Sequence, residues 1–458
     1  MKQNFKRKHI VRRLLLPLII AVAAVVVGYV AKRWDVWFQN RPEKAYSVSG
    51  GIERVLLSIG ENETSRTLTW RCDTLLQESR VYLTQELSDY MLCYSASGEI
   101  IATEGGNGAY YRCLIDSLKP GFTYSYTIST GAQTSERQSF RIPDNRNNRF
   151  SFIYFGDIQD SINGLSREIF PSVARQCPEA DFWLFGGDII ERYLDEYWAE
   201  WFTAIDTIAR QMPVLAVAGN HEQYKGYPKR LDPRFTAHHY YPNNGIDSTS
   251  RHGNYRIYGD ALIVSLTTYE LPAIDVAYKQ YCWLKKLLEN SDSKWKIVVM
   301  HHPVYSPRAS RFNVFSRLLF NPLFKKYNVD LVLQGHDHAY GRRWQREGEN
   351  TIAPLYIVSS CSPKKYAPSP NGNFDRMAAG INLYQRINVT GDTLAFAAYE
   401  TDTHLLYDSV LVIKKNGCAI VESHINKPEI WNVDAVMKNK SEEKKAAFRE
   451  KVEKRLQK

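Results

Sequence analysis

The sequence predicts an α/β domain preceded by an all-β domain, and three observations lead to this prediction. The chain has 458 residues, and at roughly 100–200 residues per domain this length suggests two or three domains. Residues 51–143 contain short runs rich in β-branched and aromatic residues, separated by turn residues at intervals of about ten, a pattern typical of a β-sandwich. From residue 149 on, continuous apolar runs alternate with amphipathic segments, which is typical of buried strands and helices.

The chain begins with a basic segment followed by an uncharged apolar stretch. Residues 1–13 carry a net charge of +6, residues 14–31 carry no charge, and Lys32 and Arg33 follow. A helix of this length is just long enough for a hydrocarbon core of ~30 Å. The positive charges predict a cytoplasmic N-terminus, with residues 34–458 outside the cytoplasm, periplasmic or at the cell surface. We expect an uncleaved transmembrane signal anchor within residues 1–39, and a cleaved signal peptide is the alternative.

The formal net charge of +10 belongs to the two ends of the chain. Residues 438–458 carry a net charge of +5, which leaves −3 for residues 34–437. This charge and the absence of a basic stripe with interleaved aromatic residues exclude a nucleic-acid partner. The seven cysteines are scattered without a CxxC pair, so we expect buried free thiols, with one bridge among Cys72, Cys93 and Cys113 as the alternative.

The predicted elements define the domain boundaries. The β-sandwich is expected over residues 40–144, the α/β domain over 145–420, and a charged, helical tail over 421–458. Within the α/β domain, apolar runs predict strands that include residues 149–157, 181–188 and 213–220. The helical periodicity predicts four helices, at 164–176, 194–210, 275–290 and 312–327. Residues 380–415 return to strands, with a turn at Gly391-Asp392.

Five of the predicted strands end in polar side chains. These residues are Asp157, Asp188, Asn220 with His221 and Glu222, His301 with His302, and His336 with Asp337 and His338. Because the carboxyl ends of parallel strands meet at the same edge of a sheet, we expect these side chains to converge. Carboxylate, amide oxygen and imidazole are the ligands of divalent metals in hydrolytic sites, so the sequence predicts a metal site.

The ordered blocks GDIQD, GGDII, GNHEQ, VVMH and GHDHAY resemble those of the calcineurin-like metallophosphoesterase superfamily, over roughly residues 149–415. The segments TLTWRCD and LIDSLKPGFTYSYTI resemble the fibronectin-III-like domain of purple acid phosphatases, which extends the resemblance to about 51–415. The resemblance implies a metallophosphoesterase β-sandwich flanked by helices (αββα) behind a fibronectin-III-like sandwich. It also implies two divalent metal ions that activate a water molecule to hydrolyse phosphate esters.

The resemblance assigns roles to individual residues. Asp188 would bridge the two metals, Asp157 and His338 would complete the first site, and the second site would be completed by Asn220, His301 and His336. His221 would act as the general acid, oriented by Asp157 or a neighbour.

Four further residues follow the ligand blocks and are candidates for substrate contact. They are His302, Tyr305, Arg308 and Tyr340. For His302 the alternative is a place behind the metal ligands, and for the other three it is packing at the rim of the site.

Two positions depart from the resembled families. The purple branch has a tyrosine that binds ferric iron where this chain has Glu191, and the wider superfamily often has a histidine ligand where this chain has Gln159. We therefore do not expect a purple ferric centre, and Gln159 or Glu191 is a candidate ligand of the first metal. An oxygen-rich first site favours Mn, Fe(II) or Mg over a pair of zinc ions, with Mn, Fe or Zn as the open choices.

Residues 223–259 form a long polar and aromatic loop. Such a loop inside a compact domain is usually functional or mobile. We expect a lid or a substrate wall with His238, His239, Tyr240 and Tyr241 as candidates, and a surface excursion is the alternative.

These observations predict a membrane-anchored, extracytoplasmic enzyme that hydrolyses small phosphate esters, with monoesters favoured. A phosphodiesterase or nucleotide hydrolase with the same site is one alternative. A non-catalytic surface binding protein with a degenerate core is another, but all six core ligand positions are filled.

Overall fold

The structure is a computed structural model of the 458-residue chain. It describes residues 2–88, 90–144, 148–246, 253–269, 271, 273–309, 311–344, 354–415, 418–423, 425 and 427–457. The chain separates into two units, one of Met1–Pro42 with Tyr224–Arg230 and the other of Glu43–Gln223 with Leu231–Lys458.

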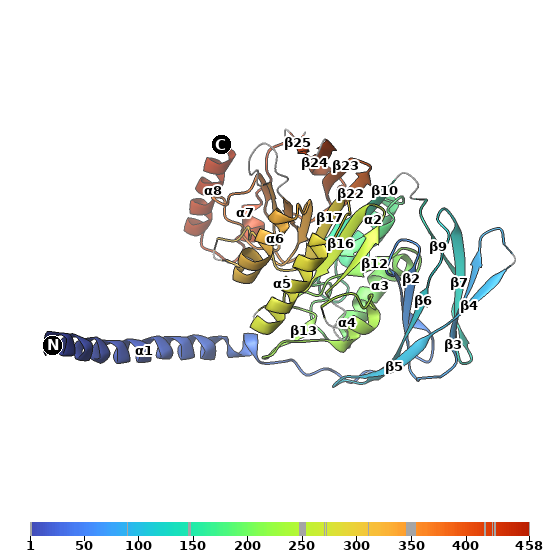
Figure 1. Ribbon diagram of the computed structural model, residues 1–458, viewed down its shortest axis with the longest axis horizontal. Coiled ribbons are helices and arrows are strands. Elements are labelled where there is room, and N and C mark those ends of the chain that lie inside the picture. The colour runs from blue at the N-terminus through green and yellow to red at the C-terminus, as the bar shows by residue number, and fades with distance from the viewer. Residues whose placement is uncertain are drawn as a thin grey trace. The chain divides into compact units, whose positions relative to one another are not determined.

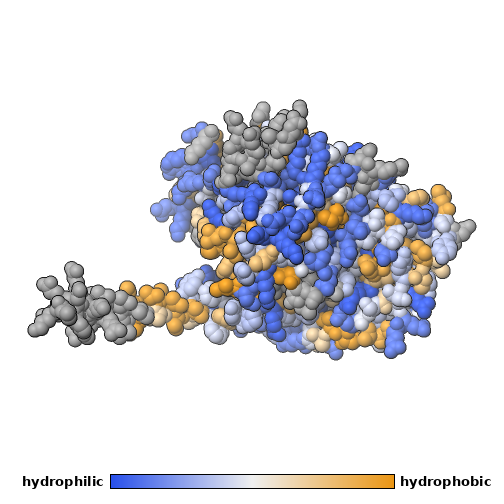
Figure 2. Space-filling view, viewed as in Figure 1, coloured by the Kyte–Doolittle hydropathy of each residue, from blue (hydrophilic) through white to orange (hydrophobic). Residues whose placement is uncertain are grey.

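The first unit contains one long helix. Helix α1 spans Lys2–Trp37, and its described apolar side chains, such as Val25 at 72% exposure, are uncovered (Figure 2). Among the residues that the structure describes, no helix combines the length and the apolarity needed to cross a membrane. Part of the predicted segment 14–31 lies outside the described residues, because the side chains of residues 14–16 and 19 are not described. The structure therefore does not support the predicted transmembrane helix.

The second unit begins with a β-sandwich, as predicted. One sheet has the order β1 (Glu53–Ile59), β2 (Arg66–Cys72), β6 (Asn107–Ile115) and β5 (Ser97–Ala102). The other contains β4 (Met91–Ser95), β3 (Ser79–Gln85), β7 (Thr123–Thr130), β8 (Gln133–Thr134) and β9 (Gln138–Arg141). The side chains of β7 are alternately buried, and Trp70 stacks on Tyr111 at 5.5 Å between ring centroids in the core. Short alternating strands of this kind bury one face of each sheet against the other.

Two seven-stranded sheets form the α/β domain (Figure 1). The first has the order β12 (Val214–Ala216), β11 (Phe182–Phe185), β10 (Arg149–Phe155), β22 (Leu383–Thr390), β23 (Thr393–Glu400), β24 (Leu406–Lys415) and β25 (Cys418–Ser423). The second has the order β15 (Asn254–Tyr258), β16 (Ala261–Leu266), β17 (Trp295–Met300), β18 (Leu331–Gln334), β20 (Leu355–Val358), β19 (Tyr340–Trp344) and β21 (Arg376–Ala378). Strands β10, β11 and β12 are parallel, as are β16, β17, β18 and β20.

Helices cover the outer faces of the two sheets. Helices α2 (Ser166–Gln176) and α3 (Asp195–Gln211) pack on the first sheet, in the core that also fills the space between the sheets. Helix α5 (Ile274–Glu289), the π-helical turn η1 (Ser316–Phe320) and α6 (Asn321–Lys326) pack on the second sheet. In β16, Ile263 points into the core between the sheets and Val264 points toward α5, as the period of two requires. The result is the predicted helix–sheet–sheet–helix architecture.

The predicted helix over 312–327 is confirmed as a continuous helical run over residues 314–326. One turn of it, η1, is π-helical, and α6 follows directly with Pro322 in its first turn. Proline lacks the N–H that an uninterrupted α-helix would need at this position, and its ring crowds the preceding turn. The tail holds two helices, α7 (Val433–Val436) and α8 (Glu442–Leu456), in place of one.

The cysteines with described side chains are free. None of these six forms a disulfide, and four of them are buried: Cys72, Cys113, Cys177 and Cys361. The expectation of free thiols is confirmed for this part of the chain, and the side chain of Cys418 lies outside it.

The histidines of loop 223–259 do not contribute to the predicted lid or substrate wall. Helix α4 (Pro233–His238) lies within it, and both His238 and His239 have at most 1% of their surface exposed. Tyr241 is also buried, and its hydroxyl bonds both the N–H and the carbonyl of Ala216 at 2.7 Å. These rings fill space beside α3 because they are large and mostly apolar. Residues 247–252 of this loop lie outside the described part.

The buried His239 predicts a loss of stability in acid. Burial, with Arg256 nearby, lowers its pKa to about 3 in the folded protein, against about 6.5 in an unfolded chain. The stability contributed by the neutral ring is complete above about pH 6.5 and falls by about 1.4 kcal/mol per pH unit below it. When the pH falls from 6.5 to 5.0, the free energy of unfolding should therefore fall by about 2 kcal/mol less in His239→Phe than in the wild type. Urea unfolding checks this, with His404→Phe as a partly exposed control, and equal pH slopes would contradict it.

Candidate metal centre

The polar strand ends lie together at one end of the two sheets. Asp157, Asp188 and Asn220 follow β10, β11 and β12, while His301 follows β17, and His336 and His338 follow β18. An isolated parallel bridge between Asp157 and Ser360 joins the end of β10 to the segment after β20. Because these strands run in one direction within each sheet, their carboxyl ends deliver side chains to a common edge.

Two glycines permit the close approach of the segments that carry these side chains. A Cβ on Gly156 would lie 1.8 Å from the carbonyl oxygen of Ser359, which is impossible without moving the backbone. A Cβ on Gly219 would lie 2.1 Å from Oδ1 of Asp188. The glycines of the GD and GNHE blocks are therefore required by packing around the carboxylates.

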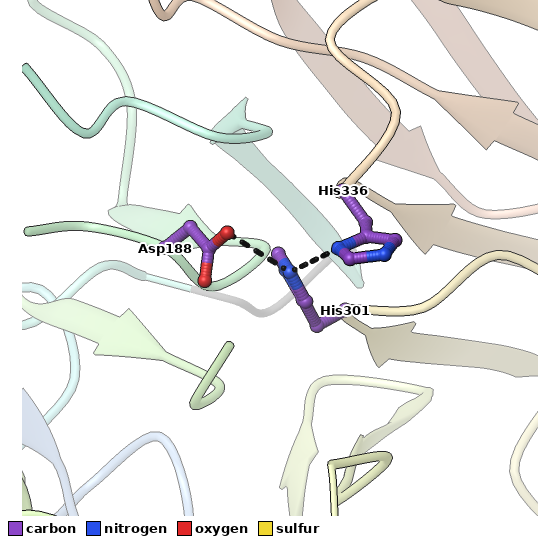
Figure 3. A group of neighbouring side chains, drawn as sticks. All are labelled: Asp188, His301 and His336. Atoms are coloured by element: carbon purple, nitrogen blue, oxygen red, sulfur yellow. Dashed lines mark hydrogen bonds and ion pairs between the residues drawn. The ribbon is translucent and has the colours of Figure 1, made fainter. Parts of the chain in front are cut away.

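A first group of side chains surrounds Nε2 of His301 (Figure 3). This nitrogen lies 3.2 Å from Oδ2 of Asp188 and 3.1 Å from Nδ1 of His336. Oδ1 of Asn220 lies 3.3 Å from the same nitrogen. Four ligand atoms from four different strand ends therefore converge on one point.

The chemistry of this first group fits a metal ion. Nδ1 of His301 donates a hydrogen bond to the carbonyl of Gly186 at 2.9 Å, so in the neutral ring Nε2 carries a lone pair. A carboxylate oxygen and an amide oxygen near this lone pair are acceptors too. Acceptors that face one another repel unless a cation lies among them, and a histidine held by a backbone carbonyl is the usual form of a metal ligand.

A second group shares Asp188 with the first. Nδ1 of His338 donates to the carbonyl of Lys364 at 3.1 Å, which leaves Nε2 for a ligand. The side-chain amide of Gln159 lies 3.3 Å from Nε2 of His338 and 3.5 Å from Oδ2 of Asp188. Oε1 of Gln159 and Oδ1 of Asp157 are buried without a hydrogen-bond partner in the described part of the chain. These two oxygens are suited to bind a second cation. Rotation of the Gln159 amide group would turn its oxygen toward such a cation.

Buried negative charge dominates the electrostatics of the site. Burial raises the pKa of Asp157 well above its usual range, and the neighbouring carboxylate of Asp188 adds to this effect. Burial lowers the pKa of His301, but the carboxylates of Asp188 and Asp157 outweigh it and raise this pKa to about 10. The site therefore holds a positive charge strongly, as a pair of carboxylates in a metal centre does.

Three of the ligand positions have an unusual backbone conformation. Asp188, His336 and His338 have φ values of 51°, 75° and 45°. Residues other than glycine rarely occupy this left-handed region, which costs about 1–3 kcal/mol each and is common at functional sites. The surrounding hydrogen bonds hold these residues in place, including the 2.6 Å bond from the N–H of His336 to Oδ2 of Asp157.

Glu191 does not join the ligands through its carboxylate. Nζ of Lys364 lies 2.7 Å from each of its carboxylate oxygens. The carbonyl of Glu191 accepts a hydrogen bond from Nδ1 of His221 at 2.5 Å. His221 is therefore oriented by Glu191 and by its own N–H bond to Asp188. Of the two predicted alternatives, Asp157 or a neighbour, the structure has a neighbour.

The candidates for substrate contact differ in their placement. Partly exposed His302 lies with its ring 4.2 Å from that of His336, and its Nδ1 is 2.9 Å from the Thr268 hydroxyl. Tyr340 is 3% exposed, and its hydroxyl donates to Asp408 at 2.6 Å. Tyr305 is 6% exposed and packs edge-on against Tyr356. Both tyrosines therefore lie in the core, because their rings fill apolar space beneath the loops.

Glu222 was overlooked among the functional residues, although it belongs to the GNHE block. Its fully buried carboxylate accepts four backbone hydrogen bonds, from Asp188 at 3.0 Å, Ile189 at 2.8 Å, Ile190 at 3.2 Å and Gly219 at 2.6 Å. It joins the loop that carries Asp188 to the loop that carries Asn220. Lys364 was also missed, because no local pattern links it to Glu191, which lies 173 positions away.

Replacing Glu222 should loosen the centre. In Glu222→Gln an NH₂ group faces backbone N–H donors, so two of the four bonds are lost, at a cost of about 2–4 kcal/mol. We expect a lower midpoint of thermal unfolding in metal-free protein and weaker Mn²⁺ binding by calorimetry. The exposed Glu168→Gln on α2 is the control, and equal behaviour of the two variants would contradict this role.

Comparison with known proteins agrees with this geometry. Residues 150–340 match the calcineurin-like phosphoesterase family, and residues 52–142 match the purple acid phosphatase N-terminal domain. The Fe(3+)-Zn(2+) purple acid phosphatase 12 of Arabidopsis thaliana is 27% identical over 349 residues, which cover 71% of this chain and 69% of that protein. Acid phosphatase type 7 of Danio rerio is 26% identical, with 84% of this chain and 94% of that protein covered.

Other relatives are matched over less of their length. The chain spans 51–60% of three further plant relatives. Among solved structures, a purple acid phosphatase from yellow lupin (Lupinus luteus) seeds has the same fold, with a TM-score of 0.70 at 16% identity over 80% of this chain and 75% of that one. These matches identify a calcineurin-like phosphoesterase domain with a purple acid phosphatase N-terminal domain before it, and they indicate a metal-dependent phosphoesterase.

Proposed function

We propose that this protein hydrolyses phosphate monoesters at a centre of two divalent metal ions. The observation that carries the proposal is the convergence of potential ligand atoms around Asp188. Oδ2 of this residue lies 3.2 Å from Nε2 of His301 and 3.5 Å from the amide of Gln159, so one carboxylate serves both groups. The complete set of ligands argues against a non-catalytic binding protein with a degenerate core.

The residues that would hold the metals fall into the two groups described above. The first metal would be held by Asp157, Gln159, Asp188 and His338, and the second by Asp188, Asn220, His301 and His336. Two metal ions supply a water molecule of lowered pKa and positive charge for the phosphate. The site of the first metal, with Asp157, Gln159, Asp188 and His338, is rich in oxygen and lacks a tyrosine, which favours Mn, Fe(II) or Mg over a coloured ferric centre.

His221 is placed to handle the proton of the leaving group. Its Nδ1 is held by the carbonyl of Glu191, and its Nε2 lies 3.9 Å from Oδ2 of Asp188, at the edge of the ligand groups. About a quarter of the side chain is exposed, so it can reach a bound substrate. In this role the imidazole donates the proton from Nε2 to the departing oxygen.

The proposal predicts a metal-dependent phosphatase activity. Dialysis against a chelator should abolish the release of nitrophenol from p-nitrophenyl phosphate, and Mn, Zn or Fe(II) should restore it. Asp188→Asn should lower kcat at least about 10³-fold, because it removes charge shared by both metals. Asp206→Asn, at a partly exposed aspartate on α3 that pairs with Arg210, should leave kcat unchanged.

The substrate panel separates the alternatives. Faster hydrolysis of bis(p-nitrophenyl) phosphate than of the monoester would favour a phosphodiesterase. No hydrolysis of either ester with any of these metals would exclude the enzymatic function and leave the binding protein.

We also propose that the protein is anchored in a membrane with its catalytic domain outside the cytoplasm. Support comes from the uncharged stretch 14–31, the positive charges before it and its place within the continuous helix α1. Val25→Glu with Val26→Glu places two charges in this stretch, each costing about 2.5–3.5 kcal/mol in a bilayer. After a carbonate wash, the double variant should be found in the soluble fraction. The matched control, Val25→Leu with Val26→Leu, should stay in the membranes. Equal retention of both would contradict the anchor.

A further inference from the structure

Four cations lie on the two segments that flank the ligand His338. Nζ of Lys365 is already bonded to the carbonyl oxygens of Ser362 and Ile381 and to Oδ1 of Asn382, which leaves three cations to consider. Arg308 and Arg311 belong to the segment after His301, and Lys364 belongs to the segment whose carbonyl accepts from His338. A phosphate substrate brings negative charge to this edge of the site, so the partners of these cations decide which of them can bind it.

Two of the three cations are already neutralised. Lys364 contacts both carboxylate oxygens of Glu191 at 2.7 Å. Arg311 lies 3.1 Å from Oδ1 of the buried Asp337. Ion pairs of this kind leave little net charge for a ligand.

Arg308 differs from the other two. Within the described part of the chain, no carboxylate forms an ion pair with it. Its guanidinium lies 4.3 Å from the ring centroid of Tyr366, and this ring lies 4.6 Å from that of His338. The two distances place the guanidinium within about 9 Å of the His338 ring. An arginine stacked on an aromatic face keeps its N–H edge free for a ligand.

The backbone of Arg308 is fixed relative to the metal ligands. Its N–H donates to Oγ of Ser306 at 3.0 Å, and this hydroxyl donates to Oδ2 of Asp337 at 2.6 Å. Asp337 is fully buried between His336 and His338 in the sequence. One carboxylate therefore holds both the hydroxyl that positions Arg308 and the guanidinium of Arg311.

We infer that Arg308 binds a second phosphate of the substrate, next to the one that is hydrolysed, and that the site prefers diphosphates such as nucleoside diphosphates. The inference rests on the proposed function and names its substrate class. A planar guanidinium binds a phosphate group through two parallel N–H bonds. A phosphate that the metals already hold does not require this contact, so Arg308 suits a second phosphate.

The reaction implied is the hydrolysis of a terminal phosphate. The oxygen of water bonds to the terminal phosphorus, and the bond from this phosphorus to the bridging oxygen breaks. The bridging oxygen leaves on the remaining phosphate and takes up one proton, so that ADP gives AMP and inorganic phosphate. Arg308 stabilises the charge that this leaving phosphate carries.

The test compares two substrates that differ in one phosphate. Wild-type protein should have a higher kcat/KM for ADP than for AMP. Arg308→Gln should lower kcat/KM for ADP about tenfold, mainly through KM, and change that for AMP less than twofold. Arg308→Lys should lie between the two. Arg112→Gln is the matched control, because Arg112 also stacks on a tyrosine, Tyr240 at 4.6 Å, but lies on strand β6 of the sandwich.

A binding measurement provides a readout that does not depend on turnover. In calorimetry, Arg308→Gln should weaken the binding of methylenediphosphonate about tenfold and leave that of inorganic phosphate unchanged. Equal losses for ADP and AMP would show that Arg308 only shapes the site through Tyr366, and unchanged ADP kinetics would also overturn the inference. If the wild type hydrolyses p-nitrophenyl phosphate but does not prefer ADP over AMP, this inference is overturned and the proposed phosphatase function still stands.

Discussion

The carboxylate of Asp188 is the group on which the rest of the site depends. Its Oδ1 accepts the N–H of His221, and its Oδ2 lies beside both His301 and Gln159. Its own N–H is held by Glu222, which also holds Gly219. The left-handed backbone at Asp188 is tolerated because these bonds over-determine its position. Two sheets, the two groups of candidate ligands and the proposed general acid therefore meet at one side chain.

Charge explains why the centre needs cations. Asp157 and Asp188 are buried beside each other, and the chain between residues 34 and 437 has a net charge of −3. The overall electrostatic field of this net-negative part of the chain would not attract an anionic phosphate. Cations bound at the strand ends offset the carboxylates and attract the substrate locally. We propose that the cations at the rim then select among substrates. Of those flanking His338, Arg308 forms no ion pair with a carboxylate in the described part, and Lys365 is already bonded to Ser362, Ile381 and Asn382.

The departure from the purple branch is compensated by a local rearrangement. Glu191 stands where that branch has its tyrosine ligand, and a carboxylate there could compete for the metal. Lys364 holds this carboxylate through both oxygens, while its own carbonyl orients His338. The carbonyl of Glu191 orients His221. The ion pair therefore connects the candidate ligand His338 to the proposed general acid His221, and Gln159 lies beside His338 and Asp188.

The sequence by itself predicted the architecture and the residue types of the site. Apolar runs that end in Gly-Asp, Gly-Asn-His and Gly-His identify buried strands with polar ends, because alternation and turn chemistry are local properties of a chain. The π-helical turn before Pro322 could have been expected on the same local grounds. By contrast, the burial of His238 and His239, the core positions of Tyr305 and Tyr340, and the pairing of Glu191 with Lys364 depend on neighbours far away in the sequence. Only the tertiary structure decided these, since burial and ion pairing are set by which distant segments pack together and not by the residues on either side.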